Sequence, residues 1–107
     1  MKESKRKNLE RAGFKVGSVQ EFLHLSDGEM AVIDLKVRLV EMLRDVRKAK
    51  GLTQHELARL VGSSQSRLAK IEAGGADVTL DLICKALFSI GVSRRALGRA
   101  IASSRAA

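Results

Sequence analysis

The sequence predicts an all-α fold, and four observations support that prediction. The 107 residues include no proline and only three aromatic residues, all of them phenylalanine. Leucine, alanine, valine, isoleucine, arginine, lysine and glutamate dominate, and these residues favour helices along most of the chain. A capping box, in which serine or threonine is followed three residues later by glutamate, precedes an apolar run at positions 18, 26 and 53. No stretch shows the alternation that is typical of a strand.

The charge indicates an anionic partner. The formal net charge is +8 and the pI is about 10.3, which suggests nucleic acid or an anionic membrane. The sequence has neither a long apolar span nor a basic amphipathic helix with aromatic anchors, so a membrane role is not expected. The basic N-terminus runs into polar residues and does not resemble a signal peptide. Cys84 is the only cysteine and is interpreted as a buried, inert thiol, and we expect a cytoplasmic protein.

Residues 1–34 are expected to form a basic N-terminal arm with a short helix and the start of a long one. The basic side chains at the beginning either track a phosphate backbone or form a solvated terminus; they are Lys2, Lys5, Arg6, Lys7 and Arg11. Ser18 and Glu21 form a capping box that predicts a helix over about 19–25. His24 has no second ligand at metal-binding spacing, so we interpret it as an ordinary surface or half-buried histidine.

Ser26 and Glu29 open a long helix that is predicted to reach about Lys50 and to end at Gly51. Its apolar positions cover more than half of its circumference, which is wider than one small domain easily uses. They are Met30, Ile33, Leu35, Val37, Leu39, Val40, Met42, Leu43 and Val46. Two interpretations remain for this face: it packs against the N-terminal helix, or it also meets a partner chain.

Residues 52–74 are predicted to form two short helices joined by a tight turn. The first begins at about Thr53, which forms a capping box with Glu56, and Gly62 ends it. The second follows Ser63 or Ser64 and ends at Gly74. Its inward residues are Leu68 and Ile71, and its outward residues are Gln65, Ser66, Arg67 and Lys70. The outward side chains are of the kinds that hydrogen-bond to base edges and phosphates, although a helical hairpin with a polar face is the alternative.

Two further helices are predicted after a loop that can hold a phosphate on its free backbone N–H groups. Asp77 or Thr79 caps a core helix over about 80–90, and Ser93 caps a last helix that reaches about Ser103. The inward residues of the last helix are predicted to be Ala96, Leu97, Ala100 and Ile101. Its outward residues are Arg94, Arg95, Arg99 and Arg105, which form a solvated face, a dimer contact or a patch that flanks DNA.

The spacing within residues 52–74 resembles the DNA-binding helix-turn-helix of the Xre/Cro family, which includes the phage repressors. The matching positions are Gln54, Ala58, Gly62, Leu68, Ile71, Glu72 and Gly74. The resemblance implies a five-helix, lambda-repressor-like DNA-binding domain over residues 35–107. It implies a homodimer on a palindromic operator of double-stranded DNA, with no cofactor.

The resemblance also implies roles for individual residues. The residues expected to read bases in the major groove are Ser64, Gln65, Ser66 and Lys70, with Arg67 reaching either a base or a phosphate. Gln54 is expected to contact a phosphate, and Thr53 and Thr79 are weaker candidates for the same role. Arg47 and Glu72 are expected to form a partly buried ion pair that positions the helix-turn-helix.

Residues 13–39 running straight into the helix-turn-helix resemble a subset of the family, the HigA-type antitoxins, many of which have tryptophan where Phe14 stands. Such proteins are encoded beside a RelE-like or HigB-like toxin that cleaves messenger RNA. The resemblance therefore implies an antitoxin that binds its toxin, with residues 1–43 as the candidate surface, and that represses its own operon in the cytoplasm, associated with the nucleoid when bound to DNA.

A stand-alone Xre regulator and a pure protein-interaction module are the alternatives to the antitoxin. Failure to bind genomic DNA would favour the interaction module. An enzyme is not expected, because two isolated histidines and one cysteine with no matching acid pair supply neither a nucleophile with its base nor a set of metal ligands.

Overall fold

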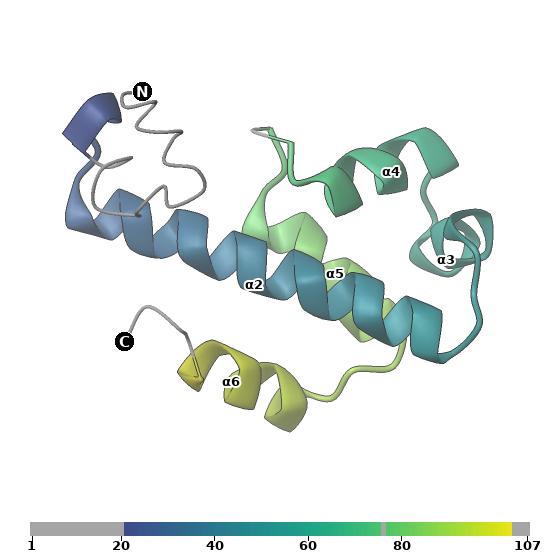
Figure 1. Ribbon diagram of the computed structural model, residues 1–107. Helices are drawn as coiled ribbons and strands as arrows, with labels where there is room; N and C mark the ends of the chain where they lie inside the picture. The colour runs from purple at the N-terminus through teal and green to yellow at the C-terminus, as the bar shows by residue number, and fades with distance from the viewer. Residues whose placement is uncertain (1–20, 76, 104–107) are drawn as a thin grey trace. The chain divides into compact units, whose positions relative to one another are not determined.

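The computed structural model describes residues 21–75 and 77–103, and over these residues it is all-helical, which confirms the predicted fold class (Figure 1). The helices are α2 (Asp27–Ala49), α3 (Gln54–Val61), α4 (Gln65–Ala73), α5 (Leu80–Ser89) and α6 (Arg94–Ala102), and residues 21–23 are helical as well. The predicted basic terminus, the Ser18 cap and Arg105 lie outside the described residues. None of the described helices is long and apolar enough to cross a membrane.

The chain divides into two units, Met1–Ile33 and Asp34–Ala107, with the division inside α2. The second unit contains the greater part of α2 together with α3 to α6, and it holds the hydrophobic core. The seven largest side chains that are fully buried there are Leu39, Leu43, Leu57, Leu68, Ile71, Ile83 and Leu87. Every helix from α2 to α5 supplies at least one of them, and α6 adds Leu97 and Ala100 to the same core.

Helix α2 begins as the sequence predicts. The backbone N–H of Ser26 donates to the Glu29 carboxylate at 2.8 Å, and the Glu29 N–H donates to the Ser26 hydroxyl at 3.1 Å. Only a narrow stripe of α2 is buried, namely Leu39, Val40 and Leu43. Three other residues of its wide apolar face are exposed to solvent: Val32, Ile33 and Val37 are 42%, 42% and 45% exposed.

The helix-turn-helix is α3, its turn and α4. The capping box of Thr53 and Glu56 is present at the start of α3, and Gly62 ends that helix in the left-handed conformation with φ 77°. Ser64 caps α4, whose last residue is followed by Gly74 at φ 73°. Helix α3 packs on both α4 and α5. The predicted boundaries of both motif helices are confirmed.

Thr79, and not Asp77, caps α5: its hydroxyl accepts a hydrogen bond from the backbone N–H of Leu82 at 3.2 Å. Cys84 on this helix is half-buried, so the prediction of a buried thiol is only partly met. Burial, and then the nearby charge of Asp81, raise the pKa of the Cys84 thiol. A raised pKa leaves less thiolate at neutral pH, which agrees with an unreactive thiol.

Helix α6 corrects one prediction. Ser93 caps it and Leu97 and Ala100 are buried as expected, but Ile101 is 43% exposed. Neighbouring residues on a helix point about 100° apart. With Ala100 facing the core in the last full turn, Ile101 is therefore turned toward solvent.

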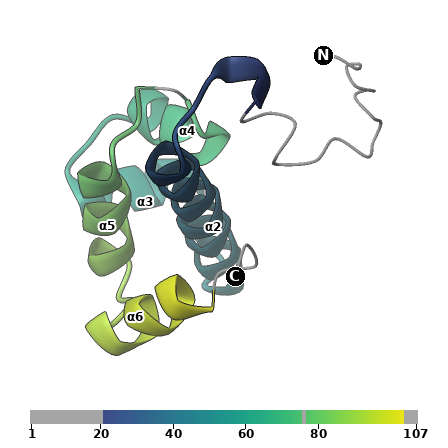
Figure 2. The same ribbon diagram turned by 90° about the vertical axis from the view of Figure 1, so that its left-hand side faces the viewer.

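Helices α4 and α6 lie on opposite sides of α2 within the second unit, with α4 above and α6 below in both views (Figures 1 and 2). Arg94, Arg95 and Arg99 of α6 are exposed. The helix that carries these arginines therefore lies on a different side of α2 from α4.

Candidate nucleic-acid interface

Helix α4 has one buried face and one exposed polar face. Leu68, Ile71 and Glu72 are 0%, 1% and 4% exposed. All five side chains that the sequence assigns to base reading are exposed; they are Ser64, Gln65, Ser66, Arg67 and Lys70. The structure therefore brings the predicted set together on one short helix and its N-cap residue, and leaves it accessible to a ligand.

Ser64 has a structural role at the beginning of this helix. Its hydroxyl accepts a hydrogen bond from the backbone N–H of Arg67 at 3.1 Å, which satisfies one of the unpaired donors of the first turn. The hydroxyl hydrogen is not used by this bond, and it can still be donated to another acceptor. Capping and DNA contact are therefore compatible at Ser64.

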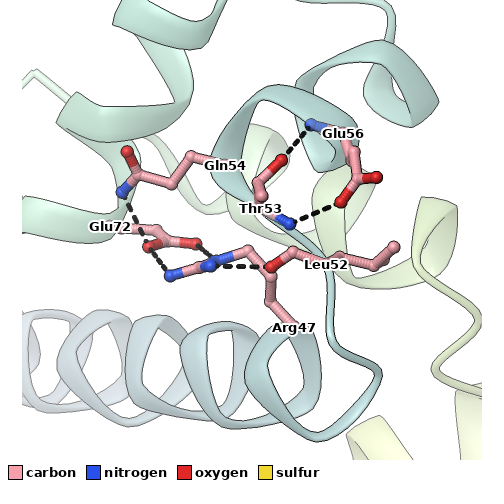
Figure 3. Close-up of polar contacts among 6 residues, drawn as sticks. All are labelled: Arg47, Leu52, Thr53, Gln54, Glu56 and Glu72. Atoms are coloured by element: carbon pink, nitrogen blue, oxygen red, sulfur yellow. Dashed lines mark hydrogen bonds and ion pairs between the residues drawn. The ribbon is translucent and has the colours of Figure 1, made fainter.

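The ion pair of Arg47 and Glu72 is present beneath the exposed face (Figure 3). Arg47 Nε donates to Glu72 Oε2 at 2.7 Å, and Nη2 donates to Oε1 at 3.0 Å. The third nitrogen, Nη1, donates to the carbonyl oxygen of Leu52 at 2.9 Å. The pair is bidentate, and its side chains are 13% and 3% exposed. Arg47 thus joins the end of α2, the start of the motif and the end of α4.

Gln54 belongs to the same network. Its Nε2 donates to Glu72 Oε1 at 3.0 Å, which ties the first residue of α3 to the last turn of α4 (Figure 3). This contact was not predicted, since the two residues are 18 positions apart and neither has a local signal for the other. A glutamine amide has two N–H groups. The bond to Glu72 therefore leaves one donor for the predicted phosphate contact.

Thr53 and Thr79 have equivalent positions at the starts of α3 and α5. Their hydroxyl oxygens accept from the backbone N–H groups of Glu56 at 3.0 Å and Leu82 at 3.2 Å, and both threonines are exposed. Hydrogen bonds from the backbone and side chain of Thr53 lower the pKa of the Glu56 carboxyl. The hydroxyl hydrogen of Thr79 remains available to a phosphate, whereas that of Thr53 is shared with the Glu56 carboxylate.

A groove lies beside α4. It is a cavity of about 390 Å³ whose first wall is the α4 face, through Ser64, Ser66, Arg67, Lys70 and Ile71. The second wall consists of Asp77, Val78 and Leu82, from the end of the α4–α5 loop and the first turn of α5. We call this cavity the α4 groove. Four of the five predicted base readers line it, and Gln65 does not.

The described residues contain no group of three histidine, cysteine or acidic side chains that could hold a metal ion. His24, the histidine in the segment before α2, is exposed and has a left-handed backbone with φ 55°.

Residues 43–87 match the model of a family described as helix-turn-helix, the Xre/Cro-like class. The matched range runs from the end of α2 through most of α5 and contains every site residue named above. No curated protein and no solved structure matches the chain. The match supports a sequence-specific DNA-binding regulator. It does not reach the segment on which the resemblance to HigA-type antitoxins rests.

Proposed function

We propose that this protein is a transcriptional repressor that binds a palindromic operator as a homodimer, with α4 in the major groove of the DNA. The observation that carries the proposal is the contrast between the two faces of α4. One face is buried against the core and fixed by the network around Glu72, and the other is exposed and polar. A rigid helix with exposed hydrogen-bonding side chains is the element with which helix-turn-helix proteins read base edges.

The side chains on α4 suit particular bases. Gln65 pairs in bidentate fashion with N6 and N7 of adenine, and Lys70 donates to O6 and N7 of guanine. Arg67 reaches a base edge or a phosphate, while the hydroxyls of Ser64 and Ser66 bond to either. An operator half-site therefore contains adenine and guanine at the positions that face Gln65 and Lys70.

The phosphate contacts come from the helix starts. Gln54 donates its remaining amide hydrogen to a phosphate, helped by the positive end of the α3 dipole, and the hydroxyls of Thr53 and Thr79 add weaker contacts. These contacts are independent of the base sequence. They set the depth and orientation with which α4 enters the groove.

The finer role that we propose is that of an antitoxin, which binds a RelE-like or HigB-like toxin and represses its own operon. The support is the resemblance of residues 13–39 to HigA-type proteins. In addition, large apolar side chains within residues 1–43 are exposed, and such side chains are typical of a surface that binds another protein. They are Phe22, Leu23, Val32, Ile33 and Val37. Such a protein acts in the cytoplasm and is associated with the nucleoid when bound to DNA.

The alternative is a stand-alone Xre-type regulator, phage-like or chromosomal, that shares the DNA site and has no toxin. A gene for a small RelE-like protein beside the gene of this chain favours the antitoxin.

One experiment tests both the proposed operator binding and the proposed antitoxin role. The full-length chain is used to capture genomic DNA fragments, which are sequenced, and proteins that copurify from cells expressing the neighbouring genes are identified by mass spectrometry. We expect enrichment of a palindromic site upstream of the gene for this chain, together with a small RelE-like protein. Enrichment of the site without such a protein would support the alternative, the stand-alone regulator. Failure to enrich any site at low salt would contradict DNA binding itself.

A further inference from the structure

Asp77 is the one acidic side chain that lines the α4 groove, and two cations, Arg67 and Lys70, line the same groove. The sequence predicts either Asp77 or Thr79 as the N-cap of α5, and in the structure the N-cap is Thr79. No hydrogen bond or ion pair within the described residues involves the Asp77 side chain, which is exposed. The carboxylate is therefore available to a ligand that enters the groove.

Hydrogen bonds hold the turn that presents this carboxylate. The backbone N–H of Gly75 donates to the carbonyl of Lys70 at 3.2 Å, and the N–H of Val78 donates to the carbonyl of Gly75 at 3.0 Å. Val78 itself is only 4% exposed and anchors the turn in the core. A Cβ at position 75 would lie 3.2 Å from Asp77 Oδ1 and 3.7 Å from the Lys70 carbonyl oxygen. The Asp77 carboxylate thus lies beside the end of α4, on a turn whose backbone is held by hydrogen bonds.

A carboxylate is an unusual group to present to DNA. It repels phosphates and offsets part of the attraction of Arg67 and Lys70, so it weakens binding to every sequence. The base-edge group that compensates a carboxylate is an amino group, and the pairing typical of aspartate in the major groove is acceptance of a hydrogen bond from N4 of cytosine. The protein then binds more weakly to any DNA sequence that lacks a cytosine amino group opposite the carboxylate.

We propose that Asp77 is a specificity-determining residue of the DNA site, which accepts a hydrogen bond from a cytosine amino group and penalises sequences that lack one at that position. This inference rests on the proposed function, because it assumes that α4 and its groove face DNA. It adds to the readers on α4 a reader that comes from the following loop. It also gives the site a repulsive element, which is a common source of discrimination between partners.

The test selects binding sites from a pool of randomised duplex DNA with the wild-type full-length chain, with Asp77→Ala and with Asp77→Asn. Asp45→Asn is the matched control, since Asp45 is also exposed but does not line the α4 groove. We expect wild type to require cytosine at one position per half-site. The alanine variant should lose about tenfold discrimination there, the usual size of one base contact. The asparagine variant should move the preference to adenine, with which asparagine pairs.

The same variants are compared on DNA of random sequence as salt is varied. Both Asp77 variants should bind this DNA several-fold more tightly, and the slope of log K against log [salt] should become steeper by about one. Tighter binding with an unchanged base preference would mean that Asp77 only repels phosphate, and this would overturn the proposal. Unchanged affinity and preference would overturn it as well. If wild type selects no sequence at all, the proposed function itself fails, which is a distinguishable result.

Discussion

Glu72 is the buried charged side chain in the described core, at 4% exposed, and it accepts hydrogen bonds from both Arg47 and Gln54. Burying a carboxylate is costly unless it is paired and hydrogen-bonded. Here the same two partners come from α2 and α3, while Glu72 is on α4. The network therefore gives α4 a defined position relative to α2 and α3, and removing one member affects more than its own contacts.

Arg47→Ala is expected to destabilise the fold strongly, because it leaves the Glu72 carboxylate with only the amide of Gln54 in a buried position. Breaking a buried pair in this way costs about 3–5 kcal/mol. Urea denaturation of the full-length chain measures the loss, and operator affinity should fall with it. Arg47→Lys keeps the charge but not the bidentate geometry, so it should show a smaller loss. Unchanged stability and DNA binding in Arg47→Ala would contradict the positioning role.

Gln65→Ala is expected to relax sequence preference without affecting stability, because Gln65 is exposed on α4. Loss of a bidentate contact to adenine should cost about 1–3 kcal/mol on the cognate operator and little on random DNA. Binding isotherms on both DNAs give the two numbers. An equal loss on the cognate and the random DNA would show that Gln65 does not read a base.

Gln54→Ala is the matched comparison for Gln65→Ala. It removes a proposed phosphate contact and also a hydrogen bond to Glu72. Binding to all sequences should therefore weaken together, and the free energy of unfolding should fall by about 1 kcal/mol as well.

The turn between α3 and α4 depends at the element scale on the backbone of Gly62. This glycine has φ 77°, and nothing lies within 4 Å of the place where a Cβ would be. An added methyl group therefore meets no neighbour, and only the left-handed backbone opposes it. For a residue with a side chain this conformation costs about 1–2 kcal/mol.

Gly62→Ala should accordingly lower the free energy of unfolding by about 1–2 kcal/mol, whereas Gly62→Asn should lower it less because asparagine tolerates the left-handed region better. Chemical denaturation of the three proteins measures the difference. Equal stability of the alanine variant and wild type would mean that the turn relaxes to a different backbone conformation.

The helix boundaries could be predicted from the sequence because their signals are local. Each capping box joins residues three apart, and the glycine at the end of a helix acts within its own turn. Ser26, Thr53, Ser64 and Ser93 accordingly lie where the sequence puts them. Two choices needed the structure, between Ser63 and Ser64 at α4 and between Asp77 and Thr79 at α5, since all four residues are of capping type.

The long-range contacts could not be predicted in the same way. The bond from Gln54 to Glu72 depends on how α3 and α4 cross, and the bond from Arg38 to Ser103, at 3.4 Å, joins residues 65 positions apart. Periodicity likewise identified the apolar stripe of α6 but not how far the core extends, so Ile101 was wrongly placed inside. The Arg47–Glu72 ion pair is predicted only by the resemblance to the Xre/Cro family, which implies that these two residues lie close together.

At the scale of the whole molecule, each chain has a single α4, which lies in the described second unit and has an exposed polar face. One recognition helix contacts only a few base pairs, which is too little for a single site to stand out from the many competing sites of a genome. A two-fold dimer doubles the number of bases read. It also requires half-sites about one helical turn, or 34–36 Å, apart.

The operator found by capture should therefore bind two chains together, and a duplex with a single half-site should bind at least tenfold more weakly. Inserting about five base pairs at the centre turns the second half-site to the opposite face of the duplex, because one turn of DNA is about ten base pairs. This insertion should reduce affinity to that of the single half-site. Sedimentation with labelled DNA gives the stoichiometry, and fluorescence anisotropy gives the affinities.

The control duplex carries the same five base pairs outside the palindrome, so that length and composition are matched while the spacing of the half-sites is kept. It should bind as tightly as the unmodified operator. If the centre insertion also left affinity and stoichiometry unchanged, each chain would be binding its half-site alone. The specificity would then have to come from a single α4 and its groove, which would give Asp77 a larger share of the discrimination.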